Sequence, residues 1–421
     1  MNHAGAGLSV AAGRAPWTLR VLYLATGAWS AALGPFAVVI LRTYGLDPVT
    51  IGLLAALAAL AATAIVPAWG HLADVLVGRV YAFQLAIAIA AACAVALLLP
   101  LPVAILAPTV VSFTLFPAMF LALGNALAVG ALSSPERQYG ALRALASLSF
   151  AVGVIVAGLL YDQAGYAAAP VVVLGWSVIL SLLLARVPDR TRDPAVRAAA
   201  VAREGDAAGG RFGSISRAFA LQPRLWPVLG FLALAYTGIL GATIFVAIRI
   251  VELGGQPSDV ALTFGIASFA EIPGLVLAGW IIRRVGLRWL ILGACLAYGL
   301  SIASWGVLPT PIAINVTRVV TGLCFGALAA ALVLVIARLL PATLQATGQT
   351  MVQAATFGLG SAAGGIVGGV LYGAFGPSAF FAFSGVLAIV GGIGTWLALY
   401  GPVGARIRPT ERIERLELPV A

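Results

Sequence analysis

The sequence predicts an all-α polytopic membrane protein with twelve transmembrane helices, arranged as two six-helix bundles related by a parallel repeat. Three observations predict this fold: the composition, the length of the apolar runs, and a repeated pattern of glycine and proline. Of the 421 residues, 62% are hydrophobic and only 9% are charged, and the mean hydropathy is +1.07. Soluble domains carry about 25% charged residues. The composition therefore excludes a soluble enzyme, a disordered chain and a secreted disulfide scaffold.

The apolar residues come in runs of about 20, which is long enough for a helix to cross ~30 Å of hydrocarbon. At roughly 35 residues for a span and its loop, the chain accommodates about twelve spans. Hydropathy places these spans at residues 17–41, 50–70, 80–100, 103–131, 141–161, 166–186, 225–250, 258–282, 289–308, 312–337, 346–372 and 378–400.

The longest polar stretch divides the chain between the sixth and seventh spans. We therefore expect an N-terminal bundle at residues 1–186, a flexible cytoplasmic linker at 187–224, a C-terminal bundle at 225–401 and a cytoplasmic tail at 402–421.

Arginine placement predicts the orientation in the membrane. All 24 basic residues are arginine, and all except Arg42, Arg249 and Arg318 fall on or near one side when the N-terminus is placed inside. Because basic residues concentrate on cytoplasmic loops, both termini are expected in the cytoplasm. The net charge of +10 is then a property of the inner face, and no nucleic-acid partner is expected.

The two halves repeat each other. Gly45, Pro48 and Gly70 match Gly254, Pro257 and Gly279, and Gly153, Gly158, Leu160, Tyr161 and Gly165 match Gly364, Gly369, Leu371, Tyr372 and Gly376 at nearly the same spacing. With six spans in each half, both halves start on the same side of the membrane. Parallel repeats of this kind are typical of transporters, with the substrate site near the midplane between the halves.

The loop after the second span resembles the loop motif G-x-L-x-D-R-x-G-R of the major facilitator superfamily. Its matching residues are Gly70, Leu72, Asp74, Gly78 and Arg79, with Val75 in place of the basic residue. In that superfamily the aspartate pairs across the inner ends of neighbouring helices and latches the outward-open state. The resemblance therefore implies a conformational latch.

The second copy of the loop carries arginine where the first has Asp74. Its residues are Gly279, Arg283, Arg284, Gly286 and Arg288. We expect Gly279, Arg284, Gly286 and Arg288 to belong to the latch without supplying its acidic group.

Further residues narrow the resemblance to the branch of lactose permease and the phenylpropionate-type permeases. They are Gly27, Pro35, Phe36, Gly45, Leu46, Ile51 and Gly52 in the first hairpin, Tyr139, Gly140 and Arg143 at the entry to helix 5, and Arg338, Pro341 and Gln349 around the turn between helices 10 and 11. Asn125 replaces an acidic residue of lactose permease, and Thr321 replaces a histidine of helix 10. The sugar-binding pair and the histidine relay of lactose permease are therefore not implied. The resemblance implies a multi-pass protein of the bacterial inner membrane.

Glu271 and Arg318 are the candidate proton-coupling residues. Glu271 lies near the middle of the eighth span, where a charge costs at least ~2.5–3.5 kcal/mol and usually faces a wet cavity. Its repeat counterpart is Ala62. Buried carboxyl groups bind and release protons closer to neutral pH than exposed ones. Arg318 begins an R-x-x-T-G sequence that resembles a proton-transfer motif of the superfamily. We expect Arg318 to tune Glu271 or to receive its proton. A structural ion pair is the alternative role for Glu271, and a purely structural role is the alternative for Arg318.

Other intramembrane polar and aromatic residues are candidates for substrate contact. Arg143 and Asn125 could bind a carboxylate or hydroxyl group, since arginine is a planar two-pronged donor; an interfacial arginine and an interhelical amide are the alternatives. Tyr23, Trp29 and Tyr236 lie in spans that line the cavity in this superfamily, and packing is their alternative role. Gln349 and Gln353 share one helix face.

These features predict secondary active transport of a small organic solute by alternating access, with protons and the lipid bilayer as further partners and a monomer as the expected state. Proton-coupled symport is the first interpretation. Proton-linked efflux of sugars or drugs is an alternative, because the sequence from Glu271 to Pro273 also resembles sugar efflux carriers. A non-transporting membrane sensor or scaffold is a third, although the linker and tail are too short for the soluble domain it would need.

The sequence also argues against an enzyme. The only histidines are His3 and His71, so no metal cluster or histidine-based triad is available. No G-x-x-x-x-G-K-[ST] loop is present, so ATP is not expected to drive the protein. No cofactor is predicted.

Overall fold

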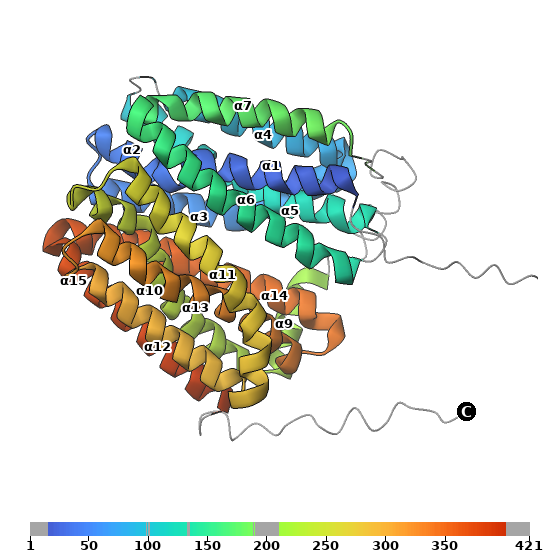
Figure 1. Ribbon diagram of the computed structural model, residues 1–421. Coiled ribbons are helices and arrows are strands. Elements are labelled where there is room, and N and C mark those ends of the chain that lie inside the picture. Colours follow the sequence, from blue (N-terminus) through green and yellow to red (C-terminus); the bar gives the residue numbers. More distant parts are fainter. Residues whose placement is uncertain are drawn as a thin grey trace, which may run out of the picture.

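The computed structural model describes residues 16–97, 99, 102–132, 135–187, 189 and 210–400, and these residues form two groups of helices (Figure 1). The first group consists of α1 (Trp17–Leu33), η1 (Gly34–Phe36), α2 (Ala37–Thr43), α3 (Pro48–His71), the π-helical η2 (Leu72–Val77), α4 (Arg79–Ala96), α5 (Val103–Ala131), α6 (Pro135–Ala164), η3 (Tyr166–Ala168) and α7 (Ala169–Leu184).

The second group consists of α9 (Gly210–Leu221), α10 (Leu225–Glu252), α11 (Pro257–Val285), α12 (Leu287–Trp305), α13 (Pro311–Leu339), η5 (Ala342–Leu344), α14 (Gln345–Gln353), the π-helical η6 (Ala354–Gly360) and α15 (Ser361–Tyr400). Helix α9 lies within the linker that was predicted to be flexible, so the last part of that linker is helical. Residues 190–209 of that linker, residues 402–421 of the tail, His3 and Arg14 lie outside the described residues.

The described residues contain eleven apolar helical segments long enough to span a membrane. The last one, Gln345–Leu399, is 55 residues long and breaks at Gly376, whose φ is 77°. This break makes two crossings of one segment, so twelve crossings result, as predicted. Span 1 is also interrupted: Gly34 and Pro35 form the 3-10 turn η1 between α1 and α2 because proline cannot continue the hydrogen bonding of α1.

Six glycines with positive φ mark the parallel repeat. They form three matched pairs, with φ of 80° and 80° at Gly45 and Gly254, 89° and 93° at Gly78 and Gly286, and 70° and 77° at Gly165 and Gly376. Residues with a Cβ rarely adopt this conformation. The glycines therefore end helices at equivalent places in the two halves, and they confirm the repeat that the sequence predicts.

The cores of the two halves contain an equivalent aromatic pair. Phe36 packs edge-on against Tyr161 with ring centroids 5.0 Å apart, and Phe245 stacks on Tyr372 at 5.3 Å. All four rings are at least 96% buried. Each pair joins the first membrane-crossing element of its half to the fifth.

The helices of each half pack in the same order. In the first half α1 packs against α6 and α7, and α3 packs against α5; in the second half α10 packs against α15, and α11 against α13. The halves meet through α3 with α15 and α6 with α11. We call the side that carries the turns at Gly45, Gly165, Gly254 and Gly376 the Asp47 end, on the left in Figure 1, and the opposite side the Arg79 end.

Close contacts between the halves lie toward the Asp47 end. The Asp162 carboxylate of α6 accepts a hydrogen bond from the Ser258 backbone N–H of α11 at 2.9 Å. A Cβ on Gly158 would overlap Ala261, and a Cβ on Gly369 would lie 2.7 Å from the carbonyl oxygen of Pro48. Backbones therefore touch directly, as small residues allow in membrane helix packing.

Candidate functional site

Two adjoining cavities lie between the halves. The first, about 250 Å³, is lined mainly by α1, α5 and α6 of the N-terminal half; the second, about 190 Å³, is lined mainly by α10 to α13 of the C-terminal half. Phe150, Ser268 and Glu271 line both cavities. Three charged side chains take part in the lining: Arg143, Glu271 and Arg318. The structure thus brings both predicted proton-coupling residues and one predicted substrate residue to one place.

Glu271 is held at the junction of the two cavities by tight packing of α11 on α13. A Cβ on Gly326 would overlap the Glu271 carbonyl oxygen, and a Cβ on Gly322 or Gly274 would likewise overlap the facing helix backbone. Within the described residues the Glu271 carboxylate forms no ion pair and accepts no hydrogen bond from the protein. Its backbone is therefore fixed while its carboxylate faces the cavity.

Arg143 of α6 is the cation that acts electrostatically on Glu271. It is exposed and lines the first cavity. The two charges come from opposite halves, because Glu271 lies on α11. The sequence predicts that Glu271 acts with Arg318 and that Arg143 contacts the substrate, and the structure places Arg143 in the same cavity as Glu271.

Arg318 is 97% buried in the C-terminal half. Its Nε donates to the Thr263 carbonyl oxygen at 2.9 Å, and its guanidinium lies 5.1 Å from the Trp305 ring centroid. Among the described residues its Nη1 has no hydrogen-bond partner, and it forms no ion pair with Glu271. Arg318 and Glu271 thus share a cavity without direct contact, and Tyr298 is the further polar group next to Arg318.

Two of the predicted substrate residues bind each other instead. The Tyr23 hydroxyl donates to Asn125 Oδ1 at 3.0 Å, which ties α1 to α5. Trp29 is 98% buried, donates from Nε1 to Ser177 Oγ at 2.8 Å and packs edge-on against Phe120. None of Tyr23, Asn125 and Trp29 lines either cavity, because their polar atoms are used in packing between helices.

The three remaining candidates also lie outside the lining of the two cavities. Tyr236 is 98% buried against Phe357, with ring centroids 5.7 Å apart. Gln349 Nε2 donates to the Val333 carbonyl oxygen at 3.2 Å, which joins α14 to α13. Gln353 is exposed, and neither glutamine lines the two cavities.

The predicted latch loop forms its ion pair locally. Asp74 Oδ1 lies 2.6 Å from Arg79 Nε, and Arg79 Nη1 donates to the Ala126 carbonyl oxygen of α5 at 3.0 Å. The Val80 backbone N–H donates to Asp189 Oδ2 at 3.0 Å, a contact that no sequence pattern indicates. The loop is therefore connected to α5 and to the segment after α7, within the N-terminal half. Gly70 has open space around its Cα.

The second copy of the loop uses aromatic partners. The guanidinium of Arg284 lies 5.4 Å from the Trp280 ring centroid, and that of Arg288 lies 5.3 Å from Trp289 and 6.0 Å from Trp396. Gly279 has only the Arg283 side chain near the place of a Cβ, at 3.6 Å, and Gly286 adopts φ 93°.

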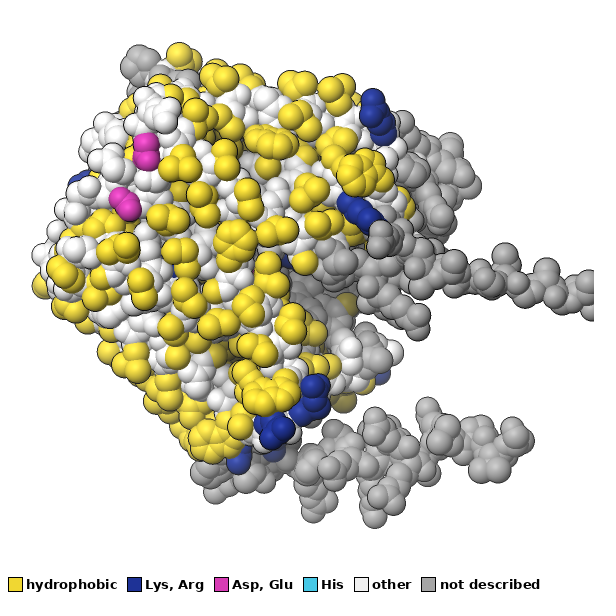
Figure 2. Space-filling view, in the orientation of Figure 1, with side chains coloured by type: hydrophobic (Ala, Val, Ile, Leu, Met, Phe, Trp, Pro, Cys, Tyr) yellow, Lys and Arg dark blue, Asp and Glu magenta, His cyan; other side chains and the backbone are white. Residues whose placement is uncertain are grey.

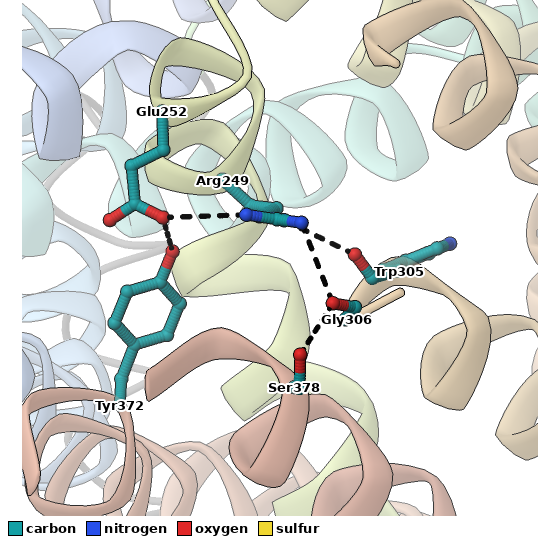
Figure 3. Close-up of polar contacts among 6 residues, drawn as sticks. All are labelled: Arg249, Glu252, Trp305, Gly306, Tyr372 and Ser378. Carbon is teal, nitrogen blue, oxygen red and sulfur yellow. Dashed lines mark hydrogen bonds and ion pairs between the residues drawn. The ribbon is translucent and has the colours of Figure 1, made fainter. Parts of the chain in front are cut away.

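A polar network at the Asp47 end of the C-terminal half was not predicted (Figure 3). Glu252 Oε2 accepts a hydrogen bond from the Tyr372 hydroxyl at 2.7 Å and lies 3.9 Å from Arg249 Nη1. The Arg249 guanidinium also donates to the carbonyl oxygens of Trp305 and Gly306, each at 3.4 Å. The i, i+3 spacing of Arg249 and Glu252 was the available sequence signal. The network connects α10, α12 and α15.

The sequence matches the MFS_1 like family over residues 16–383. The chain belongs to the MFS_1-like family. It is a transporter of the major facilitator type and a multi-pass membrane protein. No curated protein matches the chain significantly by sequence. The family also confirms the superfamily that the loop motif indicated and the prediction that the chain is not an enzyme.

Solved transporters share the fold of this MFS_1-like protein. The nucleoside transporter NupG aligns with TM-score 0.73 and 15% identity, covering 91% of this chain and 98% of that one. The peptide transporter POT in complex with sulfate aligns with TM-score 0.66 and 16% identity over 91% and 93%. A POT family transporter in complex with 5-aminolevulinic acid aligns with TM-score 0.65 and 13% identity over 89% and 94%. At these identities the likeness shows the fold.

Proposed function

We propose that this MFS_1-like protein performs secondary active transport of a small organic solute by alternating access, coupled to protons through Glu271. The observation that carries the proposal is the place of Glu271. It lies at the junction of the two cavities, between the halves, with no protein hydrogen bond to its carboxylate in the described part of the chain. A carboxyl group in a membrane interior is usually functional, and this one faces the space that a solute would occupy.

Arg143 gives Glu271 a role in the conformational cycle. With Glu271 ionised, the two side chains attract each other across the halves. Protonation of Glu271 removes that attraction and leaves Arg143 free to bind a carboxylate or hydroxyl group of the solute. Proton binding and solute binding would then favour each other, which is the requirement for symport. Arg318, Tyr298, Thr243 and Thr321 supply further polar groups in the second cavity.

The contacts between the halves support an inward-facing state. If basic residues mark the cytoplasmic side, the Arg79 end is inside and the Asp47 end, with Asp162 and its glycine contacts, is the closed outer side. In this arrangement both termini are cytoplasmic. Residues 1–186 and 225–401 are the proposed moving bundles. The proposed state is a monomer in the bacterial inner membrane. Proton-coupled uptake is the proposed direction, because proton binding at Glu271 and solute binding at Arg143 would favour each other.

Solute-induced proton movement tests this function. The purified protein would be reconstituted in vesicles containing a pH-sensitive dye and exposed to aromatic acids, sugars, nucleosides and lipophilic cations. Proton movement in the same direction as one of these compounds is the expected result. Movement in the opposite direction would make the protein an exporter, and transport of a compound with no proton movement would contradict coupling.

A further inference from the structure

A cluster of arginine and tryptophan side chains lies at the Arg79 end of α11, α12 and α15, away from the central cavities. We call this set the Arg–Trp cluster: Trp280, Arg283, Arg284, Arg288, Trp289 and Trp396. Trp289 and Trp396 contact each other with ring centroids 5.5 Å apart. Trp280, Arg283 and Arg284 share one face of α11, because residues three and four apart are neighbours on a helix.

The repeat shows that this loop differs from its counterpart in charge. In the first copy, Asp74 supplies a carboxylate 2.6 Å from Arg79. In the second copy, Arg283 stands at the position equivalent to Asp74. The cluster thus carries three guanidinium groups where the first copy carries an ion pair.

No acidic residue of the second group balances these charges locally. Residues 210–400 contain three acidic residues, of which Glu252 and Asp259 lie at the Asp47 end and Glu271 lies between the halves. In Figure 2 dark blue arginine side chains lie at the lower edge of the molecule, where α12 begins, and others lie at its upper right, whereas the magenta acidic side chains lie at the upper left. Within residues 210–400, Arg283 and Arg284 therefore have no acidic side chain at their end of the molecule.

Arg284 contacts a tryptophan ring. Its guanidinium carbon lies 5.4 Å from the Trp280 ring centroid, which is within the range of a cation–π contact. The N–H donors of arginine match the oxygens of a phosphate. A cation–π contact is electrostatic and does not itself use a hydrogen-bond donor of the arginine.

Exposed apolar side chains surround the cluster on its membrane side. Val276 is 74% exposed and Leu277 46%, and Trp280 and Trp289 are 52% and 46% exposed. Tryptophan is typical of the layer between hydrocarbon and headgroups. A phosphate at the arginines would thus have an apolar surface below it that suits acyl chains, whereas a free phosphate ion would use only the arginines.

We propose that the Arg–Trp cluster binds the headgroup of an anionic phospholipid. The phosphate lies against Arg283 and Arg284, and the acyl chains lie along the exposed face of α11. Basic pockets between transmembrane helices bind anionic headgroups by the same attraction. The site is independent of the central cavities, so it stands whether or not Glu271 carries protons.

Lipid binding to the full-length protein tests this site. The protein in detergent would be titrated with phosphatidylglycerol or phosphatidylcholine of equal chain length, and bound lipid counted by native mass spectrometry. The wild type is expected to prefer phosphatidylglycerol. The double variant Arg283→Gln/Arg284→Gln should lose about 30-fold of that preference, since each charge near an anionic surface contributes about 1 kcal/mol.

Three controls decide the interpretation. Arg217→Gln, on α9, removes a charge outside the cluster and should leave the lipid preference unchanged. An equal loss in this variant would show that the preference depends on overall charge, and it would overturn the proposed site. Arg283→Lys/Arg284→Lys keeps the charge and should retain most of the preference; a loss as large as that of the glutamine variant would overturn the role of charge. Competition by inorganic phosphate as strong as that by phosphatidylglycerol, or equal wild-type affinity for the two lipids, would also overturn it.

Discussion

The two halves of the molecule have the same backbone arrangement and differ in how their second and fourth membrane-crossing helices contact each other. In the C-terminal half, α11 and α13 touch through backbone at Gly274, Gly322 and Gly326. In the N-terminal half, the equivalent helices α3 and α5 meet through side chains, with Trp69 and Phe116 ring centroids 5.3 Å apart. The half with direct backbone contact is the half that carries Glu271 and Arg318. A rigid helix pair therefore holds the charged groups of the cavity, and the other half contributes Arg143.

The comparison separates two kinds of residue. Features present in both halves, such as the positive-φ glycines and the Phe–Tyr pair, maintain the fold. We propose that features present in one half, such as Glu271, Arg318 and the Arg–Trp cluster, serve transport or contact with the membrane. The following changes test this separation.

The largest effect is expected for the repeated aromatic pair. Phe36→Ala and Phe245→Ala each remove a fully buried ring, so each should lower the free energy of unfolding by about 3–5 kcal/mol. Thermal and denaturant unfolding in detergent would measure both. Similar losses are expected because the two rings have equivalent roles; a loss confined to one half would contradict a shared structural function.

A smaller effect is expected at the contact between α11 and α13. Gly326→Val places a side chain against the Glu271 backbone, and such overpacking should cost about 1–3 kcal/mol of stability. It should also impair transport, because Glu271 moves. Gly293→Ala is the matched control, since nothing lies within 4 Å of its Cβ position. Equal stability of the two variants would show that α11 and α13 separate easily.

Asp162 and Asp47 both cap helices, one in the other half of the molecule and one in its own half. Asp162 caps α11 of the other half, whereas Asp47 Oδ1 accepts from the Thr50 backbone N–H of its own α3 at 2.6 Å. Loss of a cap costs about 1 kcal/mol. Asp162→Ala should therefore shift the equilibrium between the closed and open Asp47 end about fivefold toward open, while Asp47→Ala should only lower stability. Distances between spin labels across that end would show the shift, and equal shifts in both variants would contradict the assignment.

The smallest effect is a pH dependence at Asp47. The Thr50 backbone N–H holds the pKa of this carboxyl below its ordinary value. Because the folded pKa is the lower one, the contribution of Asp47 to stability is complete above the unfolded value of about 3.9 and is lost as the pH falls through the folded pKa. Asp47→Asn should remove this part of the acid dependence of unfolding. An unchanged acid profile would show that the cap does not contribute.

The sequence predicted the fold well because hydropathy and glycine positions are local signals. The twelve crossings, the parallel repeat and the pairs Gly45–Gly254 and Gly165–Gly376 all follow from them. The break at Gly34 and the helix α9 inside the linker were missed, because short interruptions and short polar helices leave little trace in hydropathy.

The site was predicted less completely. Glu271, Arg318 and Arg143 were predicted because charge is rare within a membrane, and the structure places all three in the lining of the two cavities. Tyr23, Asn125 and Trp29 were interpreted as cavity residues, yet their polar atoms bond within the N-terminal half. Helix rotation and neighbouring partners decide this, and neither is visible in one sequence. Glu271 and Arg143 line one cavity from two different halves of the chain, so no local pattern could indicate that they lie there together.

The most direct test of the central claim is transport by Glu271→Gln in proteoliposomes, with Glu252→Gln as the matched control at the Asp47 end. For a compound identified by proton flux, both exchange and accumulation driven by a pH difference would be measured. The account predicts that Glu271→Gln exchanges the compound but does not accumulate it, while Glu252→Gln and the wild type do both. Accumulation by Glu271→Gln at the wild-type level would contradict proton coupling through Glu271.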